Sequence, residues 1–238
     1  MNRAALITGG AKRIGKALAV NLAKKGFDIA IHYNSSSKEA EETKTEIKNF
    51  GVNCNTFKCD LENTQDVLNL VSDVKKNFPN IYILINNASI FDNISFLDVT
   101  PEFFDRDFNI NLKAPFFLSQ GFAKNVDEGL IVNFLDTRIN RTAIDHFVYN
   151  LSKKCLYHLT RMLAKELAPA IRVNGICPGP ILPPPGENED YLAKLKEKVP
   201  MKKIGNTGYI VNAFNYLLEN DFTTGECLFV DGGKHLNY

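Results

Sequence analysis

The sequence of 238 residues lacks the segments that mark membrane-spanning and secreted proteins. It contains no apolar run of about 18 residues, so we predict no membrane span. The first ten residues, MNRAALITGG, enter a strand pattern without the apolar region and cleavage site of a signal peptide. We therefore expect a cytoplasmic protein.

The sequence also has little that suits cross-links, metals or highly charged partners. Its five cysteines are scattered, and none forms a CxxC motif, so we expect reduced thiols rather than disulfides or zinc ligands. The four histidines show no metal-ligand spacing, and no metal is predicted. The net charge is +1, from 28 Lys and Arg against 27 Asp and Glu. This balance gives no reason to expect a nucleic-acid or membrane partner.

What the sequence does have is an alternation of short apolar runs with longer amphipathic segments. Strands are expected at 4–8, 28–33, 53–59, 81–86, 130–135, 171–176 and 226–230. Helices are expected near 13–25, 38–50, 64–78, 101–125, 148–168, 190–199 and 207–219. The alternation predicts an α/β protein with one domain over 1–238: a Rossmann fold whose doubly wound, parallel, seven-stranded sheet has helices on both faces.

One segment interrupts this alternation. Residues 178–190 read PGPILPPPGENED, and their prolines and glycines exclude a helix or a central strand. A loop of this length inside a compact domain is usually functional or mobile. We predict a substrate loop or lid at about 178–200.

A glycine-rich turn, TGGAKRIG, follows the first predicted strand. Gly9 and Gly10 allow a tight turn and close approach of the backbone to a ligand, and Gly15 lets the next helix pack on the sheet. The N-terminus of that helix offers free N–H groups to a pyrophosphate. An ordinary strand-to-helix turn is the alternative, but the position between a strand and a helix favours dinucleotide binding.

The end of the second predicted strand bears on which dinucleotide binds. A site for NAD usually places Asp or Glu here to hold the ribose 2′-hydroxyl, but the chain reads HYNSSS and has no carboxylate before Glu39. Asn34, Ser35 and Ser36 can donate hydrogen bonds to the 2′-phosphate of NADP(H). A second reading, compatible with the first, is a polar turn that caps the next helix at Ser36 or Ser37.

Six motifs, in this order, resemble those of the short-chain dehydrogenase/reductase family. TGGAKRIG resembles the family's TGxxxGxG with Arg13 in place of the middle glycine, NNAS (86–89) resembles NNAG, and Asn111 resembles the helix asparagine. Tyr149 and Lys153 form the YxxxK motif, and PGP and DGG match the two C-terminal motifs. The resemblance covers nearly the whole chain. It implies an NADP(H) site made of Gly9, Lys12, Arg13, Ile14, Gly15, His32, Tyr33, Asn34, Ser35, Ser36, Asp60, Leu61, Asn87, Ala88, Ser89, Tyr149, Lys153, Pro178 and Gly179.

Within this family, the sequence is similar to the pteridine reductases. The features that carry this likeness are TGGAKRIG, NNASIF and an aspartate in the place of the catalytic serine. Lys12 and Arg13 put positive charge beside the cofactor phosphates and favour NADP(H). The related reductases often carry an arginine near the place of Ser35, and its absence implies a weaker hold on the 2′-phosphate. Asp60 matches the adenine-binding position, and it would also cap the following helix.

Tyr149 and Lys153 are four residues apart, so a helix places both side chains on one face. The positive charge of the lysine near the phenol is expected to lower the pKa of Tyr149, which would suit proton transfer near neutral pH. The resemblance implies that Lys153 also holds the nicotinamide ribose and that Asn111 positions a water in a proton relay. A tyrosine and a lysine on a half-exposed helix, without a catalytic role, are the alternative.

Asp136 lies 13 residues before Tyr149, where the wider family has a serine that binds a substrate carbonyl. An ionised carboxylate only accepts hydrogen bonds, so it serves plain ketone reduction poorly. When a ring C=N is reduced, the nitrogen must gain a proton, and a carboxylic acid or a carboxylate that relays through water suits that step. The resemblance implies that Asp136 and Tyr149 share the protonation. The alternative is a turn-capping Asp136 in an inactive protein.

The remaining substrate contacts come from the resemblance and from the lid. Phe91 matches the aromatic residue that stacks a flat pterin against the nicotinamide, and Ser89 matches a polar contact to the pterin or the cofactor phosphate. The alternative for Phe91 is a loop aromatic or a core residue. Pro180, Leu182 and the run Pro183–Pro185 are expected to cover the substrate.

The sequence therefore predicts an NADPH-dependent reductase of small dihydropterins, of the dihydrobiopterin or dihydromonapterin type and possibly dihydrofolate. Asp136, Tyr149, Lys153 and Asn111 are the predicted catalytic residues. A carbonyl reductase for a ketoacyl thioester or another ketone, and a sensor that binds NADP(H) or pterin without turnover, are the alternatives. The resemblance also implies a homotetramer, or a homodimer, built on the helices at 101–125 and 148–168.

Overall fold

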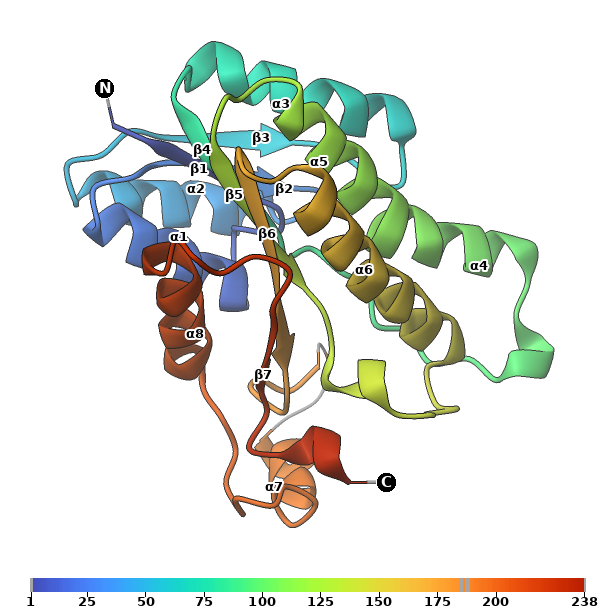
Figure 1. The fold of residues 1–238 in the computed structure, drawn as a ribbon. Helices are drawn as coiled ribbons and strands as arrows, with labels where there is room; N and C mark the ends of the chain where they lie inside the picture. Colours follow the sequence, from blue (N-terminus) through green and yellow to red (C-terminus); the bar gives the residue numbers. More distant parts are fainter. Residues whose placement is uncertain (1, 185, 187–188, 238) are drawn as a thin grey trace.

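Seven parallel strands form one sheet in the order β3-β2-β1-β4-β5-β6-β7 in the computed structural model, which describes residues 2–184, 186 and 189–237 (Figure 1). The strands are β1 (Ala4–Ile7), β2 (Asp28–Tyr33), β3 (Cys54–Lys58), β4 (Ile81–Asn86), β5 (Gly129–Phe134), β6 (Ile171–Pro178) and β7 (Cys227–Val230). The predicted single-domain Rossmann fold is confirmed. The strand order reverses between β1 and β4, and the crevice at such a reversal is where this fold binds ligands.

The central strands are apolar throughout because both faces of the sheet are covered. In β1, Ala5 and Ile7 pack into one core, whereas Ala4 and Leu6 pack into the other. All four residues are at most 1% exposed. Continuous burial of this kind is typical of parallel sheets between two helical layers.

Helices cover both faces of the sheet (Figure 1). The first layer contains α1 (Arg13–Lys24), α2 (Ser37–Lys48) and α8 (Thr207–Glu219). The second contains α3 (Thr64–Asn77), α5 (Ala114–Ala123) and α6 (Phe147–Glu166). The remaining helical segments are α4 (Pro101–Phe108), α7 (Glu189–Lys196) and the short turns η1 (Phe96–Asp98), η2 (Asn109–Lys113), η3 (Thr137–Asn140) and η4 (Lys234–Leu236). Within the described residues, every helix is too short or too polar to cross a membrane.

Two predicted boundaries differ from the structure. The single helix expected over 101–125 is interrupted by a π-helical turn, η2, which contains Asn111. π-helical turns inside helices occur frequently at functional sites. The loop predicted over 178–190 is slightly shorter in the structure: Pro178 is still paired with Val230 at the end of β6, and α7 begins at Glu189, one residue before the helix predicted near 190–199. Proline is tolerated at this strand end.

Candidate active site

A cleft of about 690 Å³ lies at the carboxyl ends of the strands. Because the strands are parallel, the segments that follow β1, β2, β4, β5 and β6 all meet there. Most of the residues predicted from the sequence line this cleft. They are Gly9, Lys12, Arg13, Ile14, Gly15, His32, Tyr33, Asn34, Ser35, Ser36, Asp60, Leu61, Asn87, Ala88, Ser89, Phe91, Asp136, Tyr149, Pro178, Gly179, Pro180 and Leu182. The predicted residues Asn111 and Lys153 are buried outside the cleft lining.

The glycine turn is as tight as its sequence predicts. Gly9 has φ +61°, and a Cβ on Gly15 would lie 2.1 Å from the Gly9 carbonyl oxygen. Arg13, in the place of the family's glycine, also adopts a left-handed conformation, with φ +56°. Its guanidinium donates a hydrogen bond of 2.6 Å to the carbonyl oxygen of Pro183. Arg13 therefore joins the glycine turn to the predicted lid.

His32 supports the glycine turn from below. Its Nδ1 accepts a hydrogen bond from the Gly9 N–H at 3.1 Å, so Nε2 carries the proton and donates to the Cys59 carbonyl at 3.0 Å. Burial lowers the pKa of His32 to about 4, partly offset by the Cys59 carbonyl and Asp60. Although His32 lines the cleft, both of its ring nitrogens are taken by the protein, so it offers a cofactor no free donor.

Two serines follow β2, and their hydroxyls are available to a ligand. Ser35 and Ser36 line the cleft, and their hydroxyls have no hydrogen-bond partner within the described residues. Ser36 stands at the N-cap position of α2 without making a capping bond, so the predicted cap at this position is wrong. The predicted cap by Asp60 is also wrong, because Asn63 caps α3 instead. Asp60 accepts a hydrogen bond from Asn34 at 3.4 Å.

The NNAS motif is fastened to the glycine turn. The Asn87 side chain donates to the carbonyl oxygens of Thr8, at 2.9 Å, and Gly9, at 3.3 Å. The backbone N–H groups of Asn87 and Ala88 donate to the Thr8 hydroxyl at 2.9 and 3.0 Å. These bonds hold the ends of β1 and β4 in one rigid unit at the switch point of the sheet.

Tyr149 and Asp136 are in direct contact in the cleft wall. The Tyr149 hydroxyl donates to Asp136 Oδ2 at 2.9 Å, whereas Asp136 Oδ1 accepts the backbone N–H of Arg138 at 2.8 Å. Asp136 therefore caps the short helix η3 with one oxygen and holds the tyrosine with the other.

The expected lowering of the Tyr149 pKa is wrong. The pKa of Tyr149 is raised well above its usual value, first by burial and then by the charge of Asp136 and the hydrogen bond to it. Lys153 Nζ lies 5.7 Å from the centre of the Tyr149 ring and donates to the Phe134 carbonyl at 2.7 Å. Burial lowers the pKa of Lys153 to about 8, against the opposing charges of Asp136 and Asp107. Tyr149 is thus held as a neutral phenol.

Asn111 is held in a buried polar network behind the reacting centre. Its Nδ2 donates to Asp107 at 2.9 Å, and its Oδ1 accepts from the Ser89 hydroxyl at 2.8 Å. Asp107 also accepts from the Ser152 hydroxyl at 2.7 Å. Burial raises the pKa of Asp107. Asp107 could not be predicted from the sequence, because nothing in the charged run around it marks one carboxylate as buried.

Phe91 lies in the cleft wall, and the histidine beside it restricts what can stack on it. The imidazole of His146 stacks on Phe91 with ring centres 3.8 Å apart and planes 13° apart. Tyr149 meets the Phe91 ring edge-on at 4.7 Å, and the guanidinium carbon of Arg138 lies 5.1 Å from the ring centre. One face of Phe91 is therefore covered, which leaves at most one face for a flat ligand.

The segment predicted as a lid contributes to the wall of the cleft. Pro180, Leu182 and Pro184 contribute to its wall, as do three residues of α7: Tyr191, Leu192 and Leu195. Pro185, also predicted to cover the substrate, lies outside the described residues.

Three cations in the cleft wall were missed by sequence reasoning: Arg106, Arg138 and Lys234. Two of them had a usable signal, because Arg138 stands two residues after Asp136 and Lys234 directly follows the DGG motif. Arg106 pairs with Asp92 at 2.8 Å.

The chain resembles known reductases over nearly its whole length. A family model described as "Enoyl-(Acyl carrier protein) reductase" matches residues 9–235. General stress protein 39 of Bacillus subtilis is 32% identical, over 98% of this chain and 84% of that protein. The 3-oxoacyl-[acyl-carrier-protein] reductase FabG of Staphylococcus epidermidis is 27% identical, over 99% of this chain and all of that protein.

The structure of FolM alternative dihydrofolate reductase 1 from Brucella canis, complexed with NADP, superposes with a TM-score of 0.93 at 38% identity. The match covers 100% of this chain and 96% of that one. The chain belongs to the short-chain dehydrogenase/reductase family of oxidoreductases.

Proposed function

We propose that this protein is an NADPH-dependent pteridine reductase, which converts dihydropterins to tetrahydropterins. The observation that carries the proposal is the 2.9 Å hydrogen bond from the Tyr149 hydroxyl to Asp136, a carboxylate where the wider family has serine. The likeness to FolM, whose structure bears the name of an alternative dihydrofolate reductase, supports it.

The residues of the cleft fit NADP(H). Helix α1 begins at Arg13 without a side-chain cap from Lys12, so the backbone N–H groups of its first turn are left for a pyrophosphate. The unpaired hydroxyls of Ser35 and Ser36 and the exposed Lys12 suit a 2′-phosphate, and no carboxylate ends β2 to repel it. When bound, NADPH supplies the hydride.

Tyr149 donates a proton to the substrate, and Asp136 helps to replace it. The raised pKa of Tyr149 keeps its proton on the phenol at neutral pH, so a ring nitrogen that gains electron density can take it. The charge of Asp136 opposes a lasting phenolate, so Tyr149 must be reprotonated at once. Asp136 Oδ2 faces the phenol and relays that proton from water in the cleft.

The other predicted catalytic residues support this pair. Lys153 Nζ lies 5.7 Å from the centre of the Tyr149 ring, and its positive charge would favour a transient phenolate. Asn111 fixes Ser89 in the cleft wall through the 2.8 Å hydrogen bond from the Ser89 hydroxyl. Phe91 contributes one ring face to a flat pterin.

A ketone reductase is the second candidate, because the relatives include a 3-oxoacyl-[acyl-carrier-protein] reductase. The two candidates differ in what residue 136 must do. A ketone needs a donor to its oxygen, and serine provides one where an ionised aspartate does not.

The experiment compares wild type with Asp136→Ser by following NADPH oxidation with 7,8-dihydrobiopterin and with a simple diketone. We expect kcat/KM for the pterin to fall by about 100-fold, the scale of a lost acid–base group, while reduction of the diketone is kept or improved. Asp127→Ser, which removes an exposed carboxylate before β5, is the matched control and should change neither. Turnover of the diketone alone by wild type would refute the proposal.

A further inference from the structure

Lys234 is a half-buried cation of the cleft wall without a partner. It lines the cleft from η4, and its amine has no hydrogen bond or ion pair within the described residues. Burial lowers the pKa of Lys234, and the charges of Arg138 and Arg141 lower it further, while Asp136 and Asp231 oppose them. Half-buried lysines usually have a direct anionic partner, and the amine of Lys234 contacts none within the described residues.

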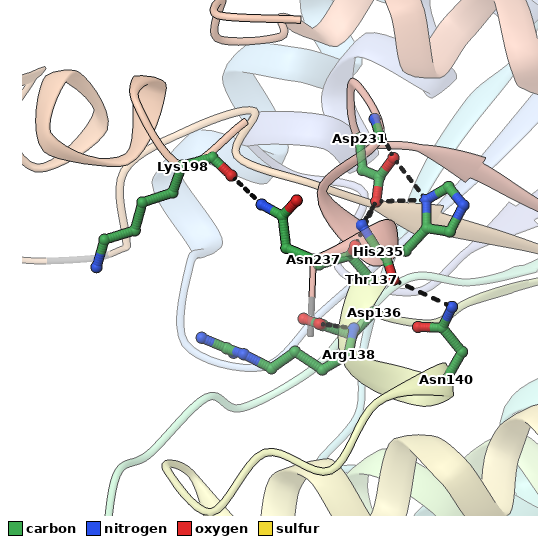
Figure 2. A network of polar contacts seen from close by, with 9 residues as sticks. Asp136, Thr137, Arg138, Asn140, Lys198, Asp231, His235 and Asn237 are labelled. Atoms are coloured by element: carbon green, nitrogen blue, oxygen red, sulfur yellow. Dashed lines mark hydrogen bonds and ion pairs between the residues drawn. The ribbon is translucent and has the colours of Figure 1, made fainter. Parts of the chain in front are cut away.

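The backbone that carries Lys234 is held rigidly beside the reacting centre. The buried carboxylate of Asp231 accepts hydrogen bonds from the backbone N–H groups of Gly233, at 2.9 Å, and His235, at 2.7 Å. It also accepts the hydroxyl of Thr137, the residue between Asp136 and Arg138 (Figure 2). One carboxylate thus fixes η4 and η3 relative to each other.

Further bonds fasten the same segment on both sides. Asn140, at the end of η3, donates to the His235 carbonyl at 3.3 Å, and Asn237 donates to the carbonyl of Lys198, near the end of the predicted lid (Figure 2). The backbone on both sides of Lys234 is therefore held in place by hydrogen bonds.

The cations around Lys234 are incompletely paired within the described residues. Arg138 pairs with Asp145 at 3.3 Å, but its Nε and the Nε of Arg141 are buried and have no hydrogen-bond partner there. The charge of Asp136 acts on Lys234, but the oxygens of Asp136 bond the Tyr149 hydroxyl and the Arg138 N–H and make no ion pair with Lys234 within the described residues. The other two carboxylates lining the cleft within the described residues, Asp60 and Glu62, follow β3 at the opposite, cofactor end.

We infer that Lys234, with Arg138 beside it, is a subsite for an anionic group on the substrate. The substrate class is then a dihydropterin whose side chain ends in a carboxylate or a phosphate, rather than one with a neutral side chain. The inference rests on the proposed pteridine reductase function and adds the charge of the tail to it.

The test measures kcat and KM for three substrates: dihydrofolate, which carries carboxylates, 7,8-dihydroneopterin monophosphate, and the neutral 7,8-dihydrobiopterin. Lys234→Gln and Lys234→Glu are compared with wild type, and Lys48→Gln, at the exposed end of α2, is the control. We expect Lys234→Gln to raise KM for an anionic substrate about tenfold, the scale of a lost charge-assisted hydrogen bond, and Lys234→Glu to raise it further. Neither variant should change KM for dihydrobiopterin by more than about twofold.

The pattern of losses identifies the tail and can overturn the inference. A change confined to dihydrofolate identifies a carboxylate tail, and one confined to the monophosphate identifies a phosphate tail. An equal loss for the neutral pterin would mean that Lys234 acts through Asp136, and no loss for either anionic substrate would mean that it binds no tail; both results overturn the inference.

A binding measurement separates this inference from the proposed function. Calorimetric titration of folate and of biopterin into the protein with NADP+ needs no turnover. If wild type reduces no dihydropterin, the proposed function is wrong. Weaker folate binding by Lys234→Glu than by wild type would still support an anion subsite at Lys234. Equal folate binding by wild type and Lys234→Glu decides against it.

Discussion

The buried ring of His32 should make the stability of the fold depend on pH. Its pKa of about 4 in the folded protein lies below the usual 6.5, because burial disfavours the charged ring. The unfolded chain therefore binds the proton more tightly. Stability from this residue is complete above about pH 6.5 and is lost as the pH falls toward 4. Because protonation of His32 favours the unfolded chain, the free energy of unfolding should fall by about 2 kcal/mol from pH 8 to pH 5.

The assay is urea denaturation from pH 8 to pH 5 of wild type and His32→Asn. The asparagine side chain can still accept the hydrogen bond from the Gly9 N–H, but it cannot titrate. It loses the hydrogen bond to the Cys59 carbonyl, so the free energy of unfolding at pH 8 should be lower than in wild type by about 1–3 kcal/mol. Its curve should be flatter than that of wild type by about 2 kcal/mol over this range. His158→Asn, at an exposed position of α6, should keep the wild-type slope. Parallel curves for wild type and His32→Asn would refute the reasoning.

Three further predictions concern the cofactor turn, the buried lysine and assembly. Gly15→Ala should lower the free energy of unfolding by about 1–3 kcal/mol and weaken NADPH binding in calorimetry, because the new Cβ would meet the Gly9 carbonyl oxygen. The control Gly121→Ala should do neither, because its Cβ would lie 3.5 Å from the nearest side chain. Since the Lys153 pKa is about 8, kcat/KM should fall above about pH 8, and a profile that stays flat to about pH 10 would contradict a role for its charge. Light scattering should find the predicted homo-oligomer in wild type and a smaller species in Phe116→Glu, because Phe116 is an exposed residue of α5; a monomeric wild type would contradict the prediction.

Much of the site was predictable because its chemistry is local in the chain. Gly9 needs a positive φ and Gly15 needs room beside it, so both requirements appear as residue types at fixed spacing. Tyr149 and Lys153 share a helix face because they are four residues apart. The alternation of apolar and amphipathic segments likewise predicted every strand of the sheet to within two residues at either end.

The features that could not be predicted depend on contacts between distant segments. Arg13 bonds Pro183, which is 170 residues away, so its link to the predicted lid has no local signal. The Tyr149 pKa is raised by burial and by the charge of Asp136, neither of which can be seen in the spacing of Tyr149 and Lys153. The place of Lys234 in the cleft depends on the bonds that tie η4 to η3.

Asp136 allows the structural and catalytic explanations of one residue to be separated. Capping η3 requires only Oδ1, which accepts the Arg138 N–H. Capping therefore does not explain why Oδ2 accepts a hydrogen bond from the Tyr149 hydroxyl. Asp136→Asn keeps a capping oxygen, and asparagine caps about as well as aspartate, so the free energy of unfolding should change by less than about 0.5 kcal/mol.

The same variant removes the charge that raises the Tyr149 pKa. Ultraviolet titration should therefore find one tyrosine that ionises at lower pH than in wild type. We expect kcat/KM for dihydropterin to fall by about 100-fold, because the amide of the variant cannot relay a proton. A destabilised protein with an unchanged rate would mean that the carboxylate only caps the turn.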